Sequence, residues 1–356
     1  MSSPGSRHVR PAPGASEATD RDRKAEHIRL ALDGRMQHGT SFFDDYRFEH
    51  VALPELDYDD IDTSCTFLGR ELAAPLLISC MTGGTDEASR INRNLAAGAQ
   101  AAGVAVGVGS QRKALEDPSH EASFRVRALA PTVPILANLG AVQLNYGFGV
   151  PECRRAVEMI DADALVFHLN PLQEAIQPEG QRDFSGLLDK IGSVASQLDV
   201  PVIVKEVGCG VSRRVASALL ERGVRFVDVA GLGGTSWARI EAARADDPQV
   251  GETFAGWGLP TPEAIRQLRG VPGLTIIGSG GIRNGIDVGR ALALGADVAG
   301  LAYPFLRAAA ESAERVVEAV RRLVHELTIC MFCVGARTLA DLKRVPLVHS
   351  RHGNEP

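Results

Sequence analysis

Eight short apolar runs, separated by helical patterns, restrict the fold of this chain more than any other feature. They lie at 75–80, 104–109, 134–140, 164–170, 201–208, 225–231, 274–280 and 297–302. Nearly continuous apolarity is typical of parallel strands that are covered on both faces. The segments between them have helical periodicity, and several end in glycine, a common C-terminal stop for a helix.

This alternation predicts an α/β fold, and eight units within roughly 230 residues match a (β/α)₈ TIM barrel. An open, doubly wound sheet is the alternative, but eight evenly spaced units favour closure. We predict a single-domain barrel over 23–345 with an N-terminal extension, a disordered leader at 1–22 and a C-terminal tail at 346–356. The aromatic-rich segment 41–70 is expected to cover the bottom of the barrel.

Composition narrows the class of partner. A hydrophobic content of 45% with 23% charged residues is ordinary for a soluble chain, and a net charge of −6 argues against nucleic acid as a partner. No apolar run is long enough to span a bilayer and no signal-like segment begins the chain, so we expect a cytoplasmic protein that binds no membrane. Six scattered cysteines suit reduced thiols, and the pair Cys330 and Cys333 reads as part of a buried helix rather than a metal or redox site.

Polar side chains gather where the fourth apolar run ends. His168 and Asn170 point to the same face of that strand, and Gln173 and Glu174 follow at once. The carboxyl ends of the strands are where α/β proteins bind ligands. A polar loop that merely caps the strand would explain any one of these residues, but the group together predicts a binding site.

Glycine-rich loops follow the seventh and eighth runs. The first of them, GSGGIRNG, allows backbone N–H groups to approach a phosphate, and the helix that follows adds positive potential. These loops therefore predict a cofactor that carries phosphate. Lys205, at the tip of the fifth run, needs an anionic partner, which is either a structural carboxylate or the electron-rich N1–C2 edge of a flavin ring.

A second group of cations lies near the N-terminus. Arg23, Lys24 and His27 can line one face of a helix, because they are three or four residues apart. An ordinary solvated surface helix has the same spacing. The functional interpretation is a mobile arm that closes over an anionic substrate.

With these motifs in place, the chain resembles the type 2 isopentenyl-diphosphate isomerases, from about Arg23 to Lys343. The segments that carry the resemblance are RKAEHIRLAL, SCMTGG, GSQR, NLGA, HLNPLQEAIQPEG, VIVKEVGCGVS, VAGLGGTSWARIE and SGGIRNGIDVGRALALGA. Members of that family are FMN-dependent barrels that interconvert isopentenyl and dimethylallyl diphosphate in isoprenoid biosynthesis. The resemblance also implies a homo-tetramer or homo-octamer.

The resemblance assigns roles position by position. It implies that FMN is bound by Met81, Thr82, Gly83, Ser110, Asn138, Lys205, Thr235, Gly280, Gly281, Arg283 and Ala302. It implies that the substrate diphosphate is bound by Arg23, Lys24, His27, Arg112, His168, Asn170 and Gln173. Glu174 would hold Mg²⁺, which prefers carboxylate and phosphate oxygens. The residues expected to act in catalysis are Gln173, His168 and Lys205.

The implied reaction protonates one carbon of an alkene and removes a proton from its neighbour. Reduced FMN is expected to act as the acid and base, through N5, and NADPH to serve only in reducing the flavin. Two alternatives stay open. Oxidation of a 2-hydroxy acid would need a His and an Arg after the sixth run, where the loop GLGGTSW contains neither. A flavin-binding or diphosphate-binding module without catalysis is the other, and HLNPLQE argues against it, since a flavin store would need no metal-binding group facing the cofactor.

Overall fold

The computed structural model describes residues 25–349, so Arg23, Lys24 and the predicted leader lie outside the described part. The strands are β1 Tyr46–Phe48, β2 Cys65–Phe67, β3 Arg70–Leu72, β4 Leu76–Ile78, β5 Ala105–Gly107, β6 Ile135–Gly140, β7 Ala164–Leu169, β8 Val202–Glu206, β9 Phe226–Asp228, β10 Thr275–Ser279, β11 Val298–Leu301 and β12 Leu347–His349. Each of the eight predicted runs contains one strand of the sheet described below.

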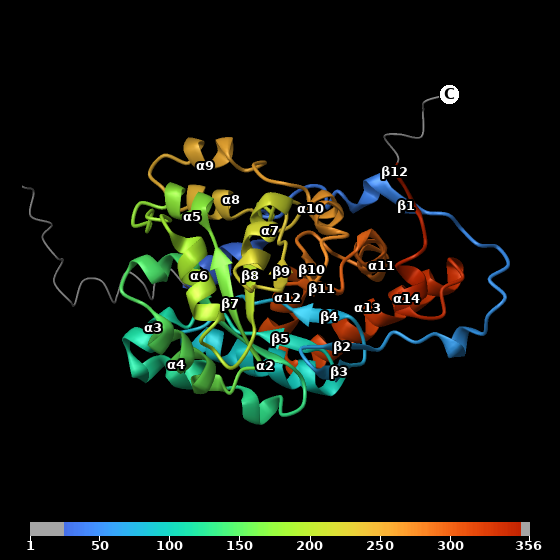
Figure 1. Ribbon diagram of the computed structural model, residues 1–356, viewed down its shortest axis with the longest axis horizontal. Helices are drawn as coiled ribbons and strands as arrows, with labels where there is room; N and C mark the ends of the chain where they lie inside the picture. Colours follow the sequence, from blue (N-terminus) through green and yellow to red (C-terminus); the bar gives the residue numbers. More distant parts are fainter. Residues whose placement is uncertain (1–24, 350–356) are drawn as a thin grey trace, which may run out of the picture.

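Strands β4 to β11 form a closed, parallel barrel in chain order (Figure 1). Closure occurs where β11 pairs with β4, with Ala299 opposite Leu76 and Leu301 opposite Ile78. The predicted (β/α)₈ barrel is therefore confirmed, and the open sheet is excluded.

Helices surround the barrel. They are α2 Asp86–Ala102, α3 Arg112–Glu116, α4 Val150–Ile160, α5 Pro171–Ile176, α6 Leu187–Ala195, α7 Arg213–Glu221, α8 Trp237–Ala242, α9 Gln249–Thr253, α10 Thr261–Leu268, α11 Gly285–Leu294, α12 Tyr303–Glu311, α13 Ala313–Cys333 and α14 Leu339–Leu342, and residues 25–33 are also helical. The connection after β5 departs from the expected pattern, because it holds only the short α3 and two 3₁₀ turns before β6. None of the described helices is both long and apolar enough to cross a membrane.

The ring of helices closes where α2 packs against α13. Helix α2 begins at Thr85, whose side chain accepts the N–H of Ala88, and ends at Gly103 in a left-handed conformation. A Cβ at Gly98 would lie 2.5 Å from Val316, so glycine allows α2 to pack closely on α13. Cys330 is buried on α13, and burial raises the pKa of its thiol to about 12.

The bottom of the barrel is closed by the β2–β3 hairpin. Phe67 and Leu72 are buried against the inward-facing residues of the barrel, and Phe67 packs edge-on against Phe226. Arg70, on the same hairpin, places Nε 2.7 Å from Asp163 Oδ1. This part of segment 41–70 covers the bottom as predicted.

The earlier part of that segment lies elsewhere. Phe43 is fully buried among the residues between the barrel and its helices, and Tyr46 pairs in register with His349 of β12. Strand β12 falls within the segment predicted as a tail, and it lies beside β1 in Figure 1. The aromatic residues at 43–48 thus pack outside the barrel strands and not at the bottom of the barrel, because strand β12 provides their partner.

Candidate active site

A cavity of about 300 Å³ lies at the C-terminal ends of the barrel strands. Loops that follow all eight strands line it, which is where ligands bind in such barrels. All eleven residues assigned to FMN line this cavity, as do His27, Arg112, His168, Asn170, Gln173 and Glu174. The structure therefore brings together every described residue of the predicted site, and Arg23 and Lys24 lie outside the described residues.

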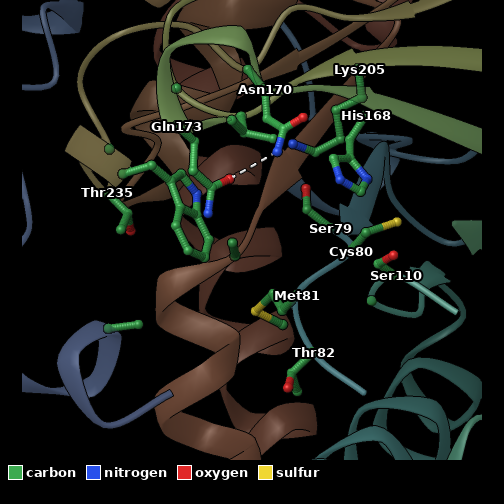
Figure 2. A pocket seen from close by; sticks show the side chains of 18 of the residues that line it. Ser79, Cys80, Met81, Thr82, Ser110, His168, Asn170, Gln173, Lys205 and Thr235 are labelled. Carbon is green, nitrogen blue, oxygen red and sulfur yellow. Dashed lines mark hydrogen bonds between the residues drawn. The ribbon is translucent and has the colours of Figure 1, made fainter. Parts of the chain in front are cut away.

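His168 lies at the end of β7, beside Lys205 (Figure 2). Its Nδ1 is 2.8 Å from Oδ1 of Asn138 on the neighbouring β6. Burial, together with the positive charges of Lys205 and Arg112, lowers the pKa of His168 to about 3. The imidazole is therefore neutral, and with Nδ1–H donating to Asn138 its Nε2 acts as an acceptor.

The polar group after β7 is held by its own hydrogen bonds. Asn170 Nδ2 donates to Gln173 Oε1 at 3.2 Å (Figure 2) and to Glu174 Oε1 at 2.8 Å. The second oxygen of Glu174 accepts from Gln177 Nε2 and from the backbone N–H of Gln181, both at 2.6 Å. Asn170 Oδ1 is buried and has no partner within the described residues. Buried polar atoms are rarely left unpaired, so this oxygen points to a bound group.

The arrangement around Glu174 is suitable for a hard cation. Within residues 25–349, no cluster of three or more His, Cys, Asp or Glu side chains forms a metal cage. Mg²⁺ is commonly held by one or two carboxylates and completed by substrate phosphates and water. Glu174 and the free oxygen of Asn170 fit that mode of binding.

Lys205, on β8, reaches the cavity with its ammonium group. Nζ donates to the backbone oxygen of Glu206 at 2.6 Å, and among the described residues no carboxylate lies within ion-pair distance of it. Asp228 lies in register with it on β9; burial raises the pKa of Asp228, and the charge of Lys205 opposes that shift. The ammonium thus keeps donors for an anionic group in the cavity.

Glycines form a close-packed cradle after β9 and β10. Gly280 and Gly281 have φ of +105° and +82°, a conformation that favours glycine. A Cβ on Gly280 would lie 2.2 Å from the oxygen of Gly231, and one on Gly234 would lie 2.9 Å from the nitrogen of Gly281. Helix α12 begins next to this cradle at Ala302, without a side-chain cap. The loops and the helix start are a fitting site for a phosphate.

Gln37, which the sequence did not single out, joins two of the predicted flavin residues. Its Nε2 donates to Thr235 Oγ1 at 2.7 Å, and its Oε1 accepts from Arg283 at 2.5 Å. The backbone of Gln37 also forms a bridge with Thr235. Gln37 lies in an irregular segment, so no periodicity could have indicated a contact almost two hundred residues away.

His27 contacts a carboxylate that sequence reasoning also missed. Its Nε2 is 3.2 Å from Oε1 of Glu241, and its ring meets Trp237 edge-on. Glu241 is fully buried on α8 and also accepts from Gln173 Nε2 at 2.8 Å. Burial alone would raise the pKa of Glu241, but His27, Gln173 and Arg244 hold it below its usual value. Glu241 follows Trp237 by four residues, so helical spacing after the glycine loop could have indicated it.

Comparison with known proteins identifies the family. The model of the FMN-dependent dehydrogenase family matches residues 168–349, which supports FMN as the cofactor. The chain is 50% identical to the isopentenyl-diphosphate delta-isomerase of Nostoc sp., with 94% of this chain and 97% of that protein covered. It is 54% identical to the protein of that name from Paracoccus zeaxanthinifaciens, with 90% and 95% covered.

Solved structures agree on the fold. A crystal structure of mandelate oxidase with 3,3-difluoro-2-hydroxy-3-phenylpropionic acid has a TM-score of 0.62 and 18% identity, with 92% of this chain and 98% of that one covered. A variant of mandelate oxidase has a TM-score of 0.64 at 17% identity, with 93% and 99% covered. At such identities the likeness concerns the barrel alone. Identity near one half along almost the whole length decides the family: the chain belongs to the isopentenyl-diphosphate delta-isomerases.

Proposed function

We propose that the protein interconverts isopentenyl and dimethylallyl diphosphate, with FMN and Mg²⁺ bound in the cavity. The observation that carries this proposal is that the glycine cradle and the group His168, Asn170, Gln173 and Glu174 open into one cavity. Relatives of about 50% identity that bear the isomerase name support the same activity.

The chain's own residues fit FMN. The glycine cradle and the start of α12 would hold its phosphate, while Arg283 is placed by Gln37 at the same end. Lys205 would face the electron-rich edge of the ring, because its ammonium has no carboxylate partner among the described residues. Reduced FMN, when bound, would supply the proton donor and acceptor for the alkene, with NADPH needed only for its reduction.

The substrate diphosphate would lie against the group that follows β7. His168, being neutral, would contribute a hydrogen-bonding nitrogen and not a fixed charge. Glu174 would hold Mg²⁺, and Arg112, at the start of α3, would neutralise phosphate charge. Asn170 and Gln173, already joined to each other, would orient the phosphate oxygens. The cation and the arginine together balance the negative charge of the diphosphate and of Glu174, which would otherwise be costly to bury.

The remaining walls would protect the reacting end from water. An alkene is a very weak base, so the positive charge that develops during its protonation must be shielded from solvent. Ile28, Trp237 and Leu306 line the cavity with apolar surface. Ile28 comes from the N-terminal helix, so that helix forms part of the substrate's enclosure.

Assay of the purified protein tests the proposal directly. With FMN, a reductant and Mg²⁺ under anaerobic conditions, it should convert isopentenyl to dimethylallyl diphosphate, and omission of the reductant should abolish turnover. Absence of turnover under reducing conditions would overturn the proposal. The hydroxy acid alternative predicts instead that lactate or glycolate reduces the bound flavin. Residues 229–236, after β9, contain neither His nor Arg, which speaks against that outcome.

The metal assignment has its own test. Glu174→Gln should reduce Mg²⁺-dependent turnover by at least about a hundredfold, because a neutral amide is a poor ligand for a hard cation. FMN absorbance should be retained, since the flavin residues are unchanged. Glu263→Gln, on the outer helix α10, is the control and should behave as the wild type. Full activity of Glu174→Gln would remove Glu174 as the metal ligand.

A further inference from the structure

Arg244, which does not line the cavity, contacts carboxylates from three separate segments just beyond the end of α8. NH1 is 2.5 Å from Glu241 Oε2, Nε is 3.2 Å from Glu26 Oε2, and NH2 is 3.3 Å from Glu179 Oε1. These partners belong to α8, to the N-terminal helix at 25–33 and to the loop after α5. One guanidinium therefore joins three elements, adding to the contacts that His27 and Gln173 make with Glu241.

Burial makes these contacts stronger than ordinary surface ion pairs. The side chain of Arg244 is 13% exposed and that of Glu241 is fully buried, so the effect of burial applies to this pair, whereas the side chains of Glu26 and Glu179 are 36% and 46% exposed and depend on the buried guanidinium for their position. Exposed pairs contribute little, whereas removal of one member of a buried pair leaves an uncompensated charge. The planar guanidinium can serve three acceptors at once, which a lysine ammonium on a flexible chain does less well.

Each of the three segments holds part of the predicted substrate site. Glu26 precedes His27 on the N-terminal helix, and Glu241 accepts a hydrogen bond from Gln173 and lies 3.2 Å from His27 Nε2. Glu179 lies in the loop from which Gln177 and the backbone of Gln181 donate to Glu174. The segments around Arg244 thus carry the residues that we assign to the substrate diphosphate, and they form that side of the cavity wall.

We propose that Arg244 is a positioning residue that ties the N-terminal helix and the loop at 177–183 to α8, so that both close over the substrate as one unit. The identity of the substrate in this inference rests on the proposed function. The role of Arg244 in joining the three segments does not. Arg244 acts through Glu241, His27 and Glu174, and it does not touch the reacting atoms.

The charge of Glu241 adds a second consequence. The groups that face it are His27 from the N-terminal helix, Gln173 from α5 and Arg244, which is itself shared with Glu26 and Glu179. Arg244 helps to hold the pKa of Glu241 below its usual value. Loss of Arg244 would raise that pKa, so Glu241 would become protonated, and would lose the negative charge that faces His27 and Gln173, at a higher pH than in the wild type.

The test is Arg244→Met in the FMN-loaded enzyme, examined by hydrogen exchange and by kinetics. Amides at 25–33 and 177–183 should exchange about tenfold faster, as expected for the loss of a buried ion pair. KM for isopentenyl diphosphate should rise about tenfold with a smaller change in kcat, and the acid limb of kcat/KM should move to higher pH. Arg244→Lys should restore the pH profile, but only part of the protection from exchange.

Arg70→Met is the matched control, because Arg70 ties the β2–β3 hairpin to Asp163 at the opposite end of the barrel. It should lower stability without changing KM or exchange at 25–33. If Arg244→Met does not fold, Glu179→Gln provides the test and should speed exchange at 177–183 alone. Unchanged exchange and KM in a folded Arg244→Met would overturn the tether. An inactive wild type would instead reject the proposed function, and the exchange experiment would still decide the tether.

Discussion

The two ends of the same barrel are built in opposite ways. At the bottom, Phe67 and Leu72 fill the barrel with apolar surface. A carboxylate there, Asp163, accepts from Arg70, from Arg127 and from the N–H of Ile135. Burial would raise the pKa of Asp163, but these three donors hold it below its usual value. The protein itself therefore satisfies Asp163 at the bottom, and this carboxylate needs no ligand.

At the top, polar groups are buried without complete partners. Asn170 Oδ1 and Ser79 Oγ have none among the described residues, and His168 is held neutral by burial. An unsatisfied buried group costs about 1–3 kcal/mol, so this end is destabilising until a ligand completes it. The comparison indicates that the bottom of the barrel stabilises the fold while the top is reserved for binding.

The largest effect should come from the bottom. Phe67→Ala should lower the free energy of unfolding by about 3–5 kcal/mol, because it empties a fully packed aromatic site. Urea unfolding measures this loss. FMN affinity of the folded protein should not change, and a parallel loss of FMN affinity would contradict the division between the two ends.

Lys205→Met should affect the top without the bottom. The ammonium makes no ion pair within the described residues, so its removal should affect stability without FMN only through the lost charge near Asp228 and Glu206. FMN binding should weaken by about tenfold to a hundredfold, the range for loss of a hydrogen bond to a charged group. Titration of flavin fluorescence gives the affinity. Wild-type affinity in this variant would place the anionic edge of the flavin elsewhere.

Gln37→Leu should have a similar but smaller effect. It would free Arg283 and Thr235 from their shared partner, so FMN affinity should fall by about tenfold through loss of their positions. Titration of flavin fluorescence measures this affinity. Gln267→Leu, on α10, offers a control glutamine whose contact is a helical pair with Glu263. Equal losses in the two variants would show that Gln37 has no specific role.

The smallest effect is the dependence of stability on pH. In the unfolded chain His168 takes up a proton near its ordinary pKa of 6.5, whereas in the fold its pKa is about 3. The unfolded state binds more protons between these values, so stability falls as the pH falls below 6.5. Glu206 opposes this, because burial raises its pKa from 4.5 to about 6 and its protonation favours the fold. The pKa of Asp163 is lowered in the fold, so its protonation reduces stability only at a still lower pH.

Urea unfolding of the protein freed of FMN, at pH 6.5 and pH 5, separates these contributions. His168→Gln should lose less stability on acidification than the wild type, since it removes the group at the top that resists protonation. Equal losses in the two proteins would show that the acid sensitivity does not originate at His168.

Much of the site could be predicted because it depends on local sequence. A strand's apolar run and the residues that follow it are consecutive, so His168 and Asn170 had to emerge at the same end of the barrel as Lys205. The glycine loops are also local, since a left-handed backbone such as that of Gly280 restricts the residue type directly.

Contacts between distant segments could not be predicted in this way. Gln37 and Arg244 lie in irregular or short elements, and their partners are separated from them by many residues. The pairing of β1 with β12 likewise joins segments far apart in the sequence, such as Tyr46 and His349. No periodicity records such contacts, because they arise only when the barrel closes and brings its loops together.

The sequence by itself therefore determined the eight-stranded barrel, the end at which its chemistry lies and the family to which the resemblance pointed. Only the tertiary structure decided that His168 is neutral, that Lys205 lacks a carboxylate partner among the described residues, and that Arg244 joins three segments. The physical reason is that charge states and ion pairs depend on burial and on neighbours from other strands. Strand periodicity, in contrast, depends on the local chain alone.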